Sequence, residues 1–287
     1  MKTACVFAMA TVSLFAQRPG ISTSAMAPDP NMVRPIAARD SVFIEELTWL
    51  EVRDAIRAGK TTVIIATGGV EQNGPYLASG KHNYVLRATT EAIARKLGNA
   101  LVAPIVPFVP EGDIVPPTGH MKYHATISLR PATFKALLTD IAESLAEHGF
   151  RHLILIGDSG GNQTGMKEVA IELTKKWLAA KTTIHFIPEY YDFYNSGALS
   201  KWMESQGVKE IDEGHHDNVA ITAMMMTVDP STVRMKERRA KGKFSINNVP
   251  LDPSEKTITL GKKAVAYRAE VTVEAIQKAL RASAPKP

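Results

Sequence analysis

Two short apolar runs constrain the fold of this chain more than any other feature. They cover residues 61–66 (TTVIIA) and residues 152–157 (HLILIG), and each opens into a loop rich in glycine and small polar residues. Runs of this length and composition are typical of strands that are buried on both faces. Strands of this kind occur in parallel sheets that helices cover on both sides, so the sequence predicts an α/β fold.

In the rest of the chain, segments whose apolar residues have the spacing of a helix alternate with segments that have the pattern of a strand. Thr48, with Glu51 three residues later, has the pattern of a capping box, and Asp217 is the expected N-cap of a methionine-rich helix. The predicted helices cover residues 48–59, 84–97, 131–148, 164–180, 195–206, 217–228 and 262–282, and the predicted strands cover residues 61–66, 100–109, 126–129, 152–157 and 183–187. This alternation predicts a mostly parallel sheet flanked by helices, in one catalytic domain over residues 48–287.

The amino-terminal segment has the pattern of a secretory signal peptide. Lys2 precedes an apolar run that is too short to span a bilayer, and small residues follow it. We expect residues 1–27 to be removed, which would give a secreted or periplasmic protein without membrane attachment and with residues 28–47 as an irregular lead-in. A disordered cytosolic tail is the alternative. Cys5 is the only cysteine, so the mature chain would have no disulfide or cysteine metal ligand.

The charge of the chain argues against a nucleic-acid partner. The 287 residues carry a formal net charge of +5, and the densest basic run covers residues 236–243 (KERRAKGK). Nucleic-acid binding requires a larger basic patch with interleaved stacking aromatic residues. We therefore interpret this run as a solvated loop and expect a small-molecule substrate.

The loop after the first predicted strand concentrates side chains that can do chemistry. Residues 67–83 read TGGVEQNGPYLASGKHN and hold a carboxylate, Glu71, and an imidazole, His82, with no helix expected between them. Loops that follow parallel strands are where α/β folds usually place binding and catalytic groups. Both residues are therefore candidates for a functional site. Glu71 bonded to backbone amides, and His82 facing solvent at a helix start, would also fit the pattern.

This loop resembles the strand-loop signature of the creatininase (creatinine amidohydrolase) family, roughly E-Q-H-G-P-H-L-P-x-x-T-D. The Glu-Gln-x-Gly-Pro-x-Leu part of the signature is present from Glu71 onward. In the family the Glu, the first His and the Asp are metal ligands. Here Asn73 stands at the position of the histidine and His82 at that of the aspartate. The resemblance therefore implies a metal site that has lost part of its ligands.

Further segments agree with the family in order and spacing. The segment ILIGDSGGN resembles its N-G-H-G-G-N loop, with Ser159 at the position of a metal-binding histidine and Asp158 where a glycine is usual. His120, followed by TISL, resembles the family pattern H-x-x-F-P-G-T-I-S-L. His216 falls on the family's catalytic histidine. Family members form hexamers built from dimers, so the resemblance also implies a homo-oligomer.

The resemblance implies a metal-dependent hydrolase in which activated water attacks a carbonyl carbon. The family uses two metal ions, whereas the ligands kept here imply one divalent ion, zinc or manganese, held by Glu71, His82 and Asp158. His216 would be the catalytic proton shuttle, because histidine titrates near neutrality. The substrate would be small and polar: a cyclic amide, a lactone or a cyclic ketone. The polar residues expected to bind it are Asn73, His120, Ser159 and Asn162.

Two other functional classes remain open. A protein that kept the pocket and lost the metals would be a metal-free binding protein of the same fold. The string GDSGG also fits the G-x-S-x-G nucleophile elbow of α/β-hydrolases, in which Ser159 would attack the substrate. That serine mechanism requires a later carboxylate and then a histidine, but the last histidine of the chain is His216.

Overall fold

The structure is a computed structural model that describes residues 28–178 and 180–283. The predicted signal peptide, residues 1–27, lies outside the described residues. The chain divides into two units, Met1–Ala37 and Ala38–Pro287. The described part of the first unit contains a hydrogen-bonded turn, and the second unit contains the sheet and the helices.

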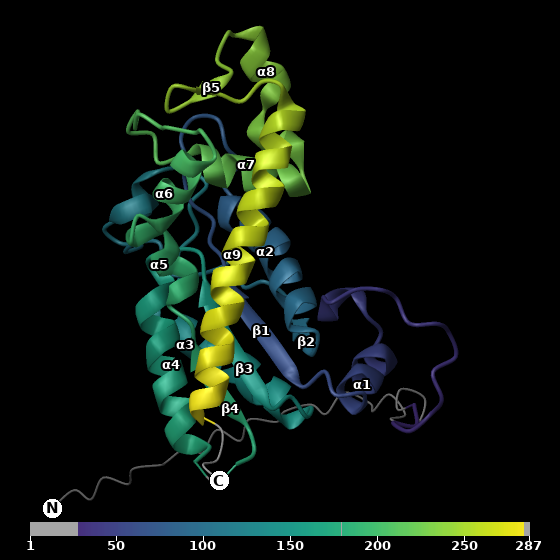
Figure 1. The fold of residues 1–287 in the computed structure, drawn as a ribbon. Coiled ribbons are helices and arrows are strands. Elements are labelled where there is room, and N and C mark those ends of the chain that lie inside the picture. The colour runs from purple at the N-terminus through teal and green to yellow at the C-terminus, as the bar shows by residue number, and fades with distance from the viewer. Residues whose placement is uncertain (1–27, 179, 284–287) are drawn as a thin grey trace, which may run out of the picture. The chain divides into compact units, whose positions relative to one another are not determined.

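The second unit is built on a four-stranded parallel sheet with the strand order β2-β1-β3-β4 (Figure 1). Residue by residue, β1 pairs with β3 from Thr62 opposite His152 to Thr67 opposite Gly157. The carboxyl ends of these two central strands therefore lie next to each other, as do the loops that follow them. The predicted parallel sheet is confirmed, with strands β1 (Thr62–Thr67), β2 (Ala100–Val102), β3 (His152–Gly157) and β4 (Thr183–Phe186).

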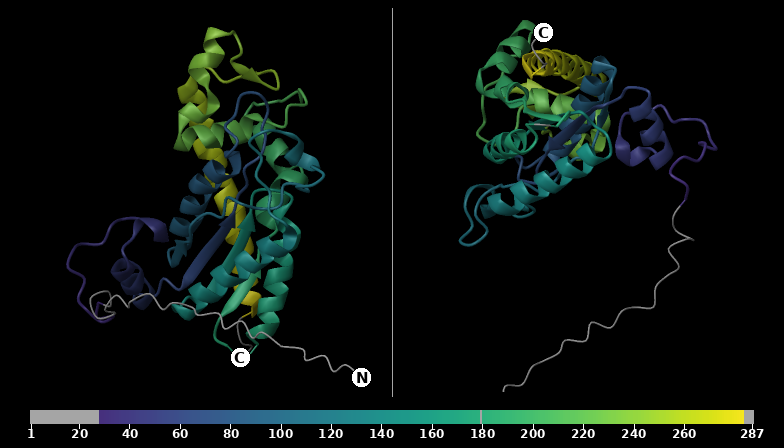
Figure 2. Two further views of the ribbon diagram at one scale, coloured as in Figure 1. Left: turned by 180° about the vertical axis from the view of Figure 1, so that it is seen from behind. Right: turned by 90° about the horizontal axis from the view of Figure 1, so that it is seen from below.

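Helices cover both faces of the sheet (Figure 2). Side chains alternate between the two faces of a strand, so Val63 of β1 packs with Phe134 of α3, whereas Ile64 packs with Leu86 of α2 and Ile276 of α9. The α-helices are α1 (Trp49–Arg57), α2 (Lys81–Leu97), α3 (Pro131–Glu147), α4 (Asn162–Lys176), α5 (Glu189–Asn195), α6 (Ala198–Ser205), α7 (Val219–Val228), α8 (Met235–Ala240) and α9 (Ser254–Ser283). None of the helices in the described residues is both long enough and apolar enough to cross a membrane.

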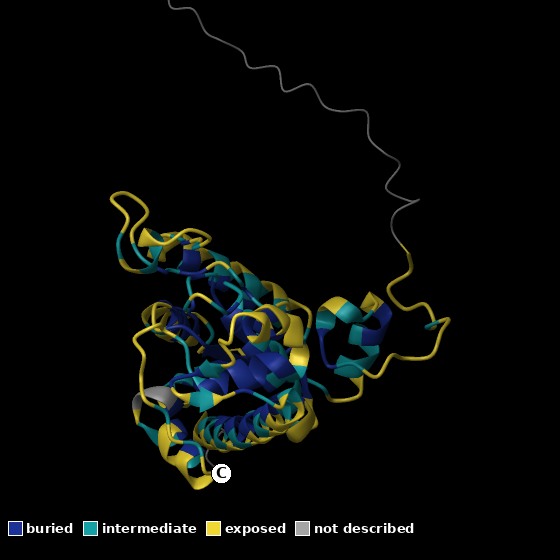
Figure 3. Ribbon diagram, turned by 90° about the horizontal axis from the view of Figure 1, so that it is seen from above, coloured by how far each residue is buried: buried dark blue, intermediate teal, exposed yellow. Residues whose placement is uncertain are grey.

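A third apolar cluster lies beyond the sheet, around α7. This methionine-rich helix is buried from Val219 to Met226 and packs against α2 and α9. A short hairpin, β5 (Ser245–Ile246) and β6 (Val249–Pro250), contributes Ile246 to the same cluster. Figure 3 shows the buried residues gathered on the sheet and on the inner faces of the helices.

The lead-in before residue 48 is partly ordered against the core. Val42 and Phe43 are buried, and Phe43 forms a bridge with Val102 at the end of β2. A single 3-10 turn, η2 (Ile44–Glu46), then leads to α1, where Thr48 closes the predicted capping box with Glu51. The start of α1 is thus confirmed.

Several predicted elements differ from the structure. The strand predicted over residues 126–129 is only two isolated bridges, of Ile127 with Val70 and of Ser128 with Val109. The strand predicted over residues 100–109 ends at Val102, because the prolines that follow cannot donate to a ladder, and only single bridges continue it. The helix predicted over residues 195–206 is instead the end of α5 and the separate helix α6, which Gly197 divides in the left-handed conformation, with φ +71°. The last helix is longer than predicted and begins at Ser254.

Candidate active site

The site lies at the carboxyl ends of β1 and β3. Glu71 lies in the loop after β1, and Asp158 directly follows β3. His82 lies in the first turn of α2 rather than in the loop, because α2 begins at Lys81, earlier than predicted. The loop is held against this helix by Asn83, whose side-chain amide donates to the Gly69 carbonyl at 3.2 Å. The sheet therefore brings three residues that the sequence singled out to one edge.

His82 connects two carboxylates. Its Nε2 lies 2.7 Å from Oε1 of Glu71, and its Nδ1 lies 2.7 Å from Oδ2 of Asp158. The other oxygen of Asp158 lies 2.7 Å from Nη2 of Arg268 on α9, and both of these side chains are fully buried. Arg268 also donates to the Tyr190 carbonyl at 3.0 Å. We call this chain of contacts, Glu71–His82–Asp158–Arg268, the buried relay.

The electrostatics of the buried relay favour the charged forms of Glu71, His82 and Asp158. Burial alone would raise the pKa of Glu71, but the hydrogen bond and charge of His82 outweigh it, so the pKa lies well below its usual range. Burial likewise opposes the charge of Asp158, and the neighbouring Arg268 guanidinium overcomes it and lowers the pKa. Burial would lower the pKa of His82, but its hydrogen bonds to both carboxylates raise it. The two carboxylates thus favour the protonated form of the His82 imidazole.

Two further histidines approach Glu71 from its open side. His120 lies on the 3-10 turn η3 (Gly119–Lys122), and its Nε2 is 3.2 Å from Oε2 of Glu71. His216 lies before α7, and its Nε2 is 3.8 Å from Oε1 of Glu71. The two imidazole rings stack with centroids 4.6 Å apart. Nδ1 of His216 donates to the Gln72 carbonyl at 3.0 Å, which fixes the ring and leaves Nε2 facing Glu71.

Glu71, His120 and His216 fit a single divalent ion. Each offers one ligand atom, and these atoms lie within 4.8 Å of one another. One carboxylate and two imidazoles make a ligand set of catalytic zinc sites, which keep a further position open. We call this group the ligand trio. In contrast, both ring nitrogens of His82 already contact carboxylates, which leaves neither nitrogen open toward an ion. The predicted ligand set of Glu71, His82 and Asp158 stays a prediction.

Sequence reasoning missed Glu111, which lies in the loop that carries His120. Its Oε2 accepts a hydrogen bond from Ser159 Oγ at 3.2 Å, while its buried Oε1 has no hydrogen-bond partner in the described residues. Burial, and then the charge of Glu71, raise the pKa of Glu111 to about 9, so it is protonated at neutral pH. A signal for it in the sequence is the glycine that follows, Gly112, which indicates a tightly constrained turn. In the structure Gly112 has φ +128°, and a Cβ there would lie 2.1 Å from the Thr118 carbonyl oxygen.

The two asparagines predicted to bind substrate brace the loops. The Nδ2 of Asn73 donates to the Glu71 carbonyl at 2.9 Å. The Nδ2 of Asn162 donates to the carbonyls of Thr67 and Gly68, at 3.0 and 2.9 Å, and so ties the loop after β3 to the end of β1. Both side chains are buried. Their observed contacts therefore hold the site in shape.

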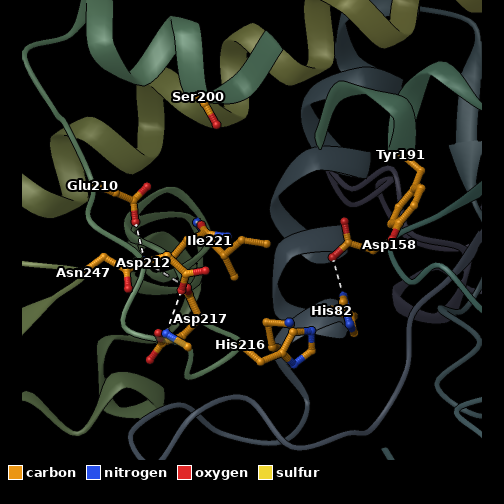
Figure 4. A pocket seen from close by; sticks show the side chains of 13 residues that line it. His82, Asp158, Tyr191, Ser200, Glu210, Asp212, His216, Asp217, Ile221 and Asn247 are labelled. Atoms are coloured by element: carbon orange, nitrogen blue, oxygen red, sulfur yellow. Dashed lines mark hydrogen bonds and ion pairs between the residues drawn. The ribbon is translucent and has the colours of Figure 1, made fainter. Parts of the chain in front are cut away.

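Two adjoining cavities open onto the site. The smaller, of about 330 Å³, is lined by Glu71, Glu111, His120, Ser159 and His216 among others. The larger, of about 690 Å³, extends past His82, Asp158 and His216 toward α7 (Figure 4). Its far wall includes Asp217, which was predicted to cap α7. That prediction is wrong, because Asn218 is the N-cap and accepts from the Ile221 amide at 2.8 Å.

Comparison with known proteins identifies relatives of this chain. The family model described as creatinine amidohydrolase matches residues 45–279. The creatinine amidohydrolase of Pseudomonas putida is 27% identical over 259 residues, which are 85% of this chain and 98% of that protein. Three solved structures, a manganese creatininase, a zinc-zinc variant and a variant complexed with creatine, match with TM-scores of 0.60, 0.61 and 0.60. Each is 23% identical and covers 86% of this chain and 100% of its own.

These relatives confirm the predicted resemblance and the α/β fold. Manganese and zinc forms occur among the solved relatives, and this chain has a possible metal site in the ligand trio. For this chain, the ligand trio supports the expectation of a divalent metal ion.

Proposed function

Because this chain is an enzyme of the creatininase family of amidohydrolases, we propose that it is an exported hydrolase that uses one divalent ion to add water to the carbonyl carbon of a small cyclic amide. The observation that carries the proposal is the ligand trio at the mouth of both cavities. Lactones and cyclic ketones share the carbonyl carbon and are weaker candidates. The relative solved with creatine supports a small polar substrate.

The two sides of Glu71 have different tasks in this proposal. When bound, the ion would be held by Glu71, His120 and His216 and would supply a Lewis acid and an acidified water. His82 binds one oxygen of Glu71 and thereby turns the other toward His120. His216 was predicted as the proton shuttle. In this proposal it is instead a metal ligand, which the 3.8 Å distance from its Nε2 to Glu71 Oε1 supports.

Glu111 is then the residue that can move a proton. Its carboxyl lines the smaller cavity next to the ligand trio, and its Oε1 has no hydrogen-bond partner in the described residues. Ser159 Oγ donates to the other oxygen, Oε2, at 3.2 Å and so fixes the orientation of the carboxyl group. We assign Glu111 as the acid that protonates the leaving nitrogen when the amide bond breaks. The contact with Glu111 also gives Ser159 a role other than that of a nucleophile.

Export and assembly belong to the same proposal. Lys2 and the apolar run after it support removal of a signal peptide and a secreted or periplasmic location. Amino-terminal sequencing of protein recovered from the native host should find a start between residues 17 and 33. An intact Met1 would contradict export. We also propose a homo-oligomer, which light scattering of the purified protein would test.

The hydrolase is tested by turnover, chelation and one serine variant. Metal-free protein would be loaded with zinc or manganese and assayed with creatinine, other cyclic amides and lactones. We expect hydrolysis of a cyclic amide that chelation abolishes and that Ser159→Ala retains. A covalent adduct of Ser159 with a phosphonate probe, together with activity that resists chelation, would instead establish serine chemistry. Ligand binding without turnover of any substrate would favour the metal-free binding protein.

A further inference from the structure

Lys81 occupies a position where a lysine is unfavourable. It is the first residue of α2, and its side chain is only 6% exposed. The amino end of a helix carries unpaired N–H groups and the positive pole of the helix dipole, which disfavour a cation. The first turn of α2 contains no acidic residue to offset this. Positions that break local rules in this way are concentrated at functional sites.

The partner of this buried cation is Glu71. Nζ of Lys81 lies 3.4 Å from Oε1 of Glu71, the same oxygen that Nε2 of His82 contacts at 2.7 Å. Two consecutive residues of α2 thus contact one oxygen of the candidate metal ligand, and Lys81 places its positive charge there. A solved relative is a zinc-zinc form, whereas the ligand trio here fits one ion. Lys81 brings a second source of positive charge to this carboxylate.

Lys81 also faces the space where a substrate would lie. It lines the larger cavity together with His216, and it is the one lysine or arginine among the described residues that line it. Two carboxylates on the far side of that cavity are occupied by contacts of their own. Glu210 accepts from the Val219 amide at 2.7 Å, and Asp212 accepts from the Gly214 amide at 2.8 Å. Lys81 is therefore the cation that both the ligand trio and the cavity share.

We propose that Lys81 is a catalytic residue whose ammonium binds the oxyanion formed during hydrolysis; this rests on the proposed amide hydrolase. Water loses one proton to solvent and adds as hydroxide to the carbonyl carbon. The π electron pair of the C=O bond moves onto the oxygen, where Lys81 pairs with it. The pair then returns as the C–N bond breaks, and the nitrogen takes the proton of Glu111. Charged donors aimed at a developing oxyanion in a water-poor site are among the strongest catalytic contributions.

A binding experiment tests this without any substrate. Inorganic phosphate is a tetrahedral oxyanion, and its affinity for zinc-loaded protein can be measured by calorimetry. Lys81→Met, which removes the charge and keeps the chain length, should bind phosphate at least about tenfold more weakly than wild type. Lys81→Arg should stay within about threefold of wild type, because it keeps the charge. Lys135→Met is the matched control, since Lys135 is a lysine on α3 that pairs with Glu168 and lines neither cavity.

Zinc affinity provides a second readout. Replacing a lysine that only stabilises the fold would not be expected to strengthen zinc binding. Because Lys81→Met removes a positive charge near Glu71, it should bind zinc at least about fivefold more tightly than wild type does. The expected signature is thus tighter metal and weaker oxyanion binding in one variant. If wild type binds no phosphate, or if Lys81→Met binds it as tightly as wild type, the proposal is overturned. Lys81→Gln replaces Lys81→Met if thermal denaturation shows that the latter is not folded.

Kinetics separate this proposal from the proposed function. With a substrate that wild type hydrolyses, Lys81→Met should lose at least about a hundredfold in kcat with little change in KM. An unchanged kcat would overturn the catalytic role of Lys81 and leave the hydrolase intact. If wild type hydrolyses no carbonyl substrate, the proposed function fails, while the phosphate and zinc measurements still decide whether Lys81 binds an oxyanion.

Discussion

On one side of Glu71, every side chain is buried and paired: His82 lies between two carboxylates, and Arg268 closes the relay from α9. On the other side, His120 and His216 come from loops, their side chains are 32% and 42% exposed, and they approach Glu71 at 3.2 and 3.8 Å. The first side fixes the direction of the carboxylate before any ligand arrives. The second side keeps the access that an ion and a substrate need. The same carboxylate thus joins a rigid support to an open binding site.

The largest expected effect comes from breaking the support at its far end. Arg268→Met would leave Asp158 buried without its guanidinium, and losing one partner of a buried ion pair typically costs about 3–5 kcal/mol. Urea denaturation should show a loss of that size in the free energy of unfolding. Arg281→Met, at the exposed end of the same helix, is the control and should change it little.

A double variant checks the cause of that loss. Arg268→Met combined with Asp158→Asn removes both charges, so we expect it to be more stable than Arg268→Met alone. Equal instability of the two would mean that packing of the arginine, not pairing of its charge, supports the site.

Glu111 is expected to matter for the reaction and little for the metal. Glu111→Gln keeps the shape but has no proton to give, so kcat should fall by about 10²–10⁴-fold while the zinc content stays unchanged. Asp113→Asn, on the same loop and exposed, is the matched control. Near-normal turnover by Glu111→Gln would remove it from the mechanism and return the proton transfer to His216.

The smallest expected effect is a local change in dynamics on metal binding. Adding zinc to metal-free protein should slow amide exchange in residues 119–122 and residues 214–217, because both carry a histidine of the ligand trio on a loop. The amides of β1 and β3 should not change, because neither strand carries a residue of the ligand trio. Protection that spreads over these strands would show that the two sides of Glu71 are not independent.

Much of this arrangement could be predicted because it depends on local sequence. The apolar run of residues 152–157 forms β3 over its full predicted length, and the loops after β1 and β3 meet, as parallel strands require. Glu71 and His82 were placed at the site for the same reason. The role of His82 was harder to predict. Its contacts with two carboxylates depend on the fold, and in the sequence alone such a histidine cannot be told from a metal ligand.

The residues that were missed depend on tertiary packing. Arg268 reaches Asp158 from α9, far along the chain, and its only local signal is a charged residue on the buried stripe of Ala264 and Thr272. Lys81 was hidden because α2 was expected to start after it. Glu111 lies in a long loop. An isolated bridge between Val109 and Ser128 sets the course of this loop, and the spacing of apolar residues in the sequence does not predict such a bridge.

The central claim is that one ion is held by Glu71, His120 and His216, and elemental analysis of reconstituted protein tests it most directly. We predict one zinc or manganese ion per chain in wild type and in His215→Ala, an exposed neighbour that serves as the control. We predict near-complete loss of the ion in His216→Ala and in His120→Ala, with the fold retained. Two tightly bound ions in wild type, or a full complement of metal in His216→Ala, would contradict the account.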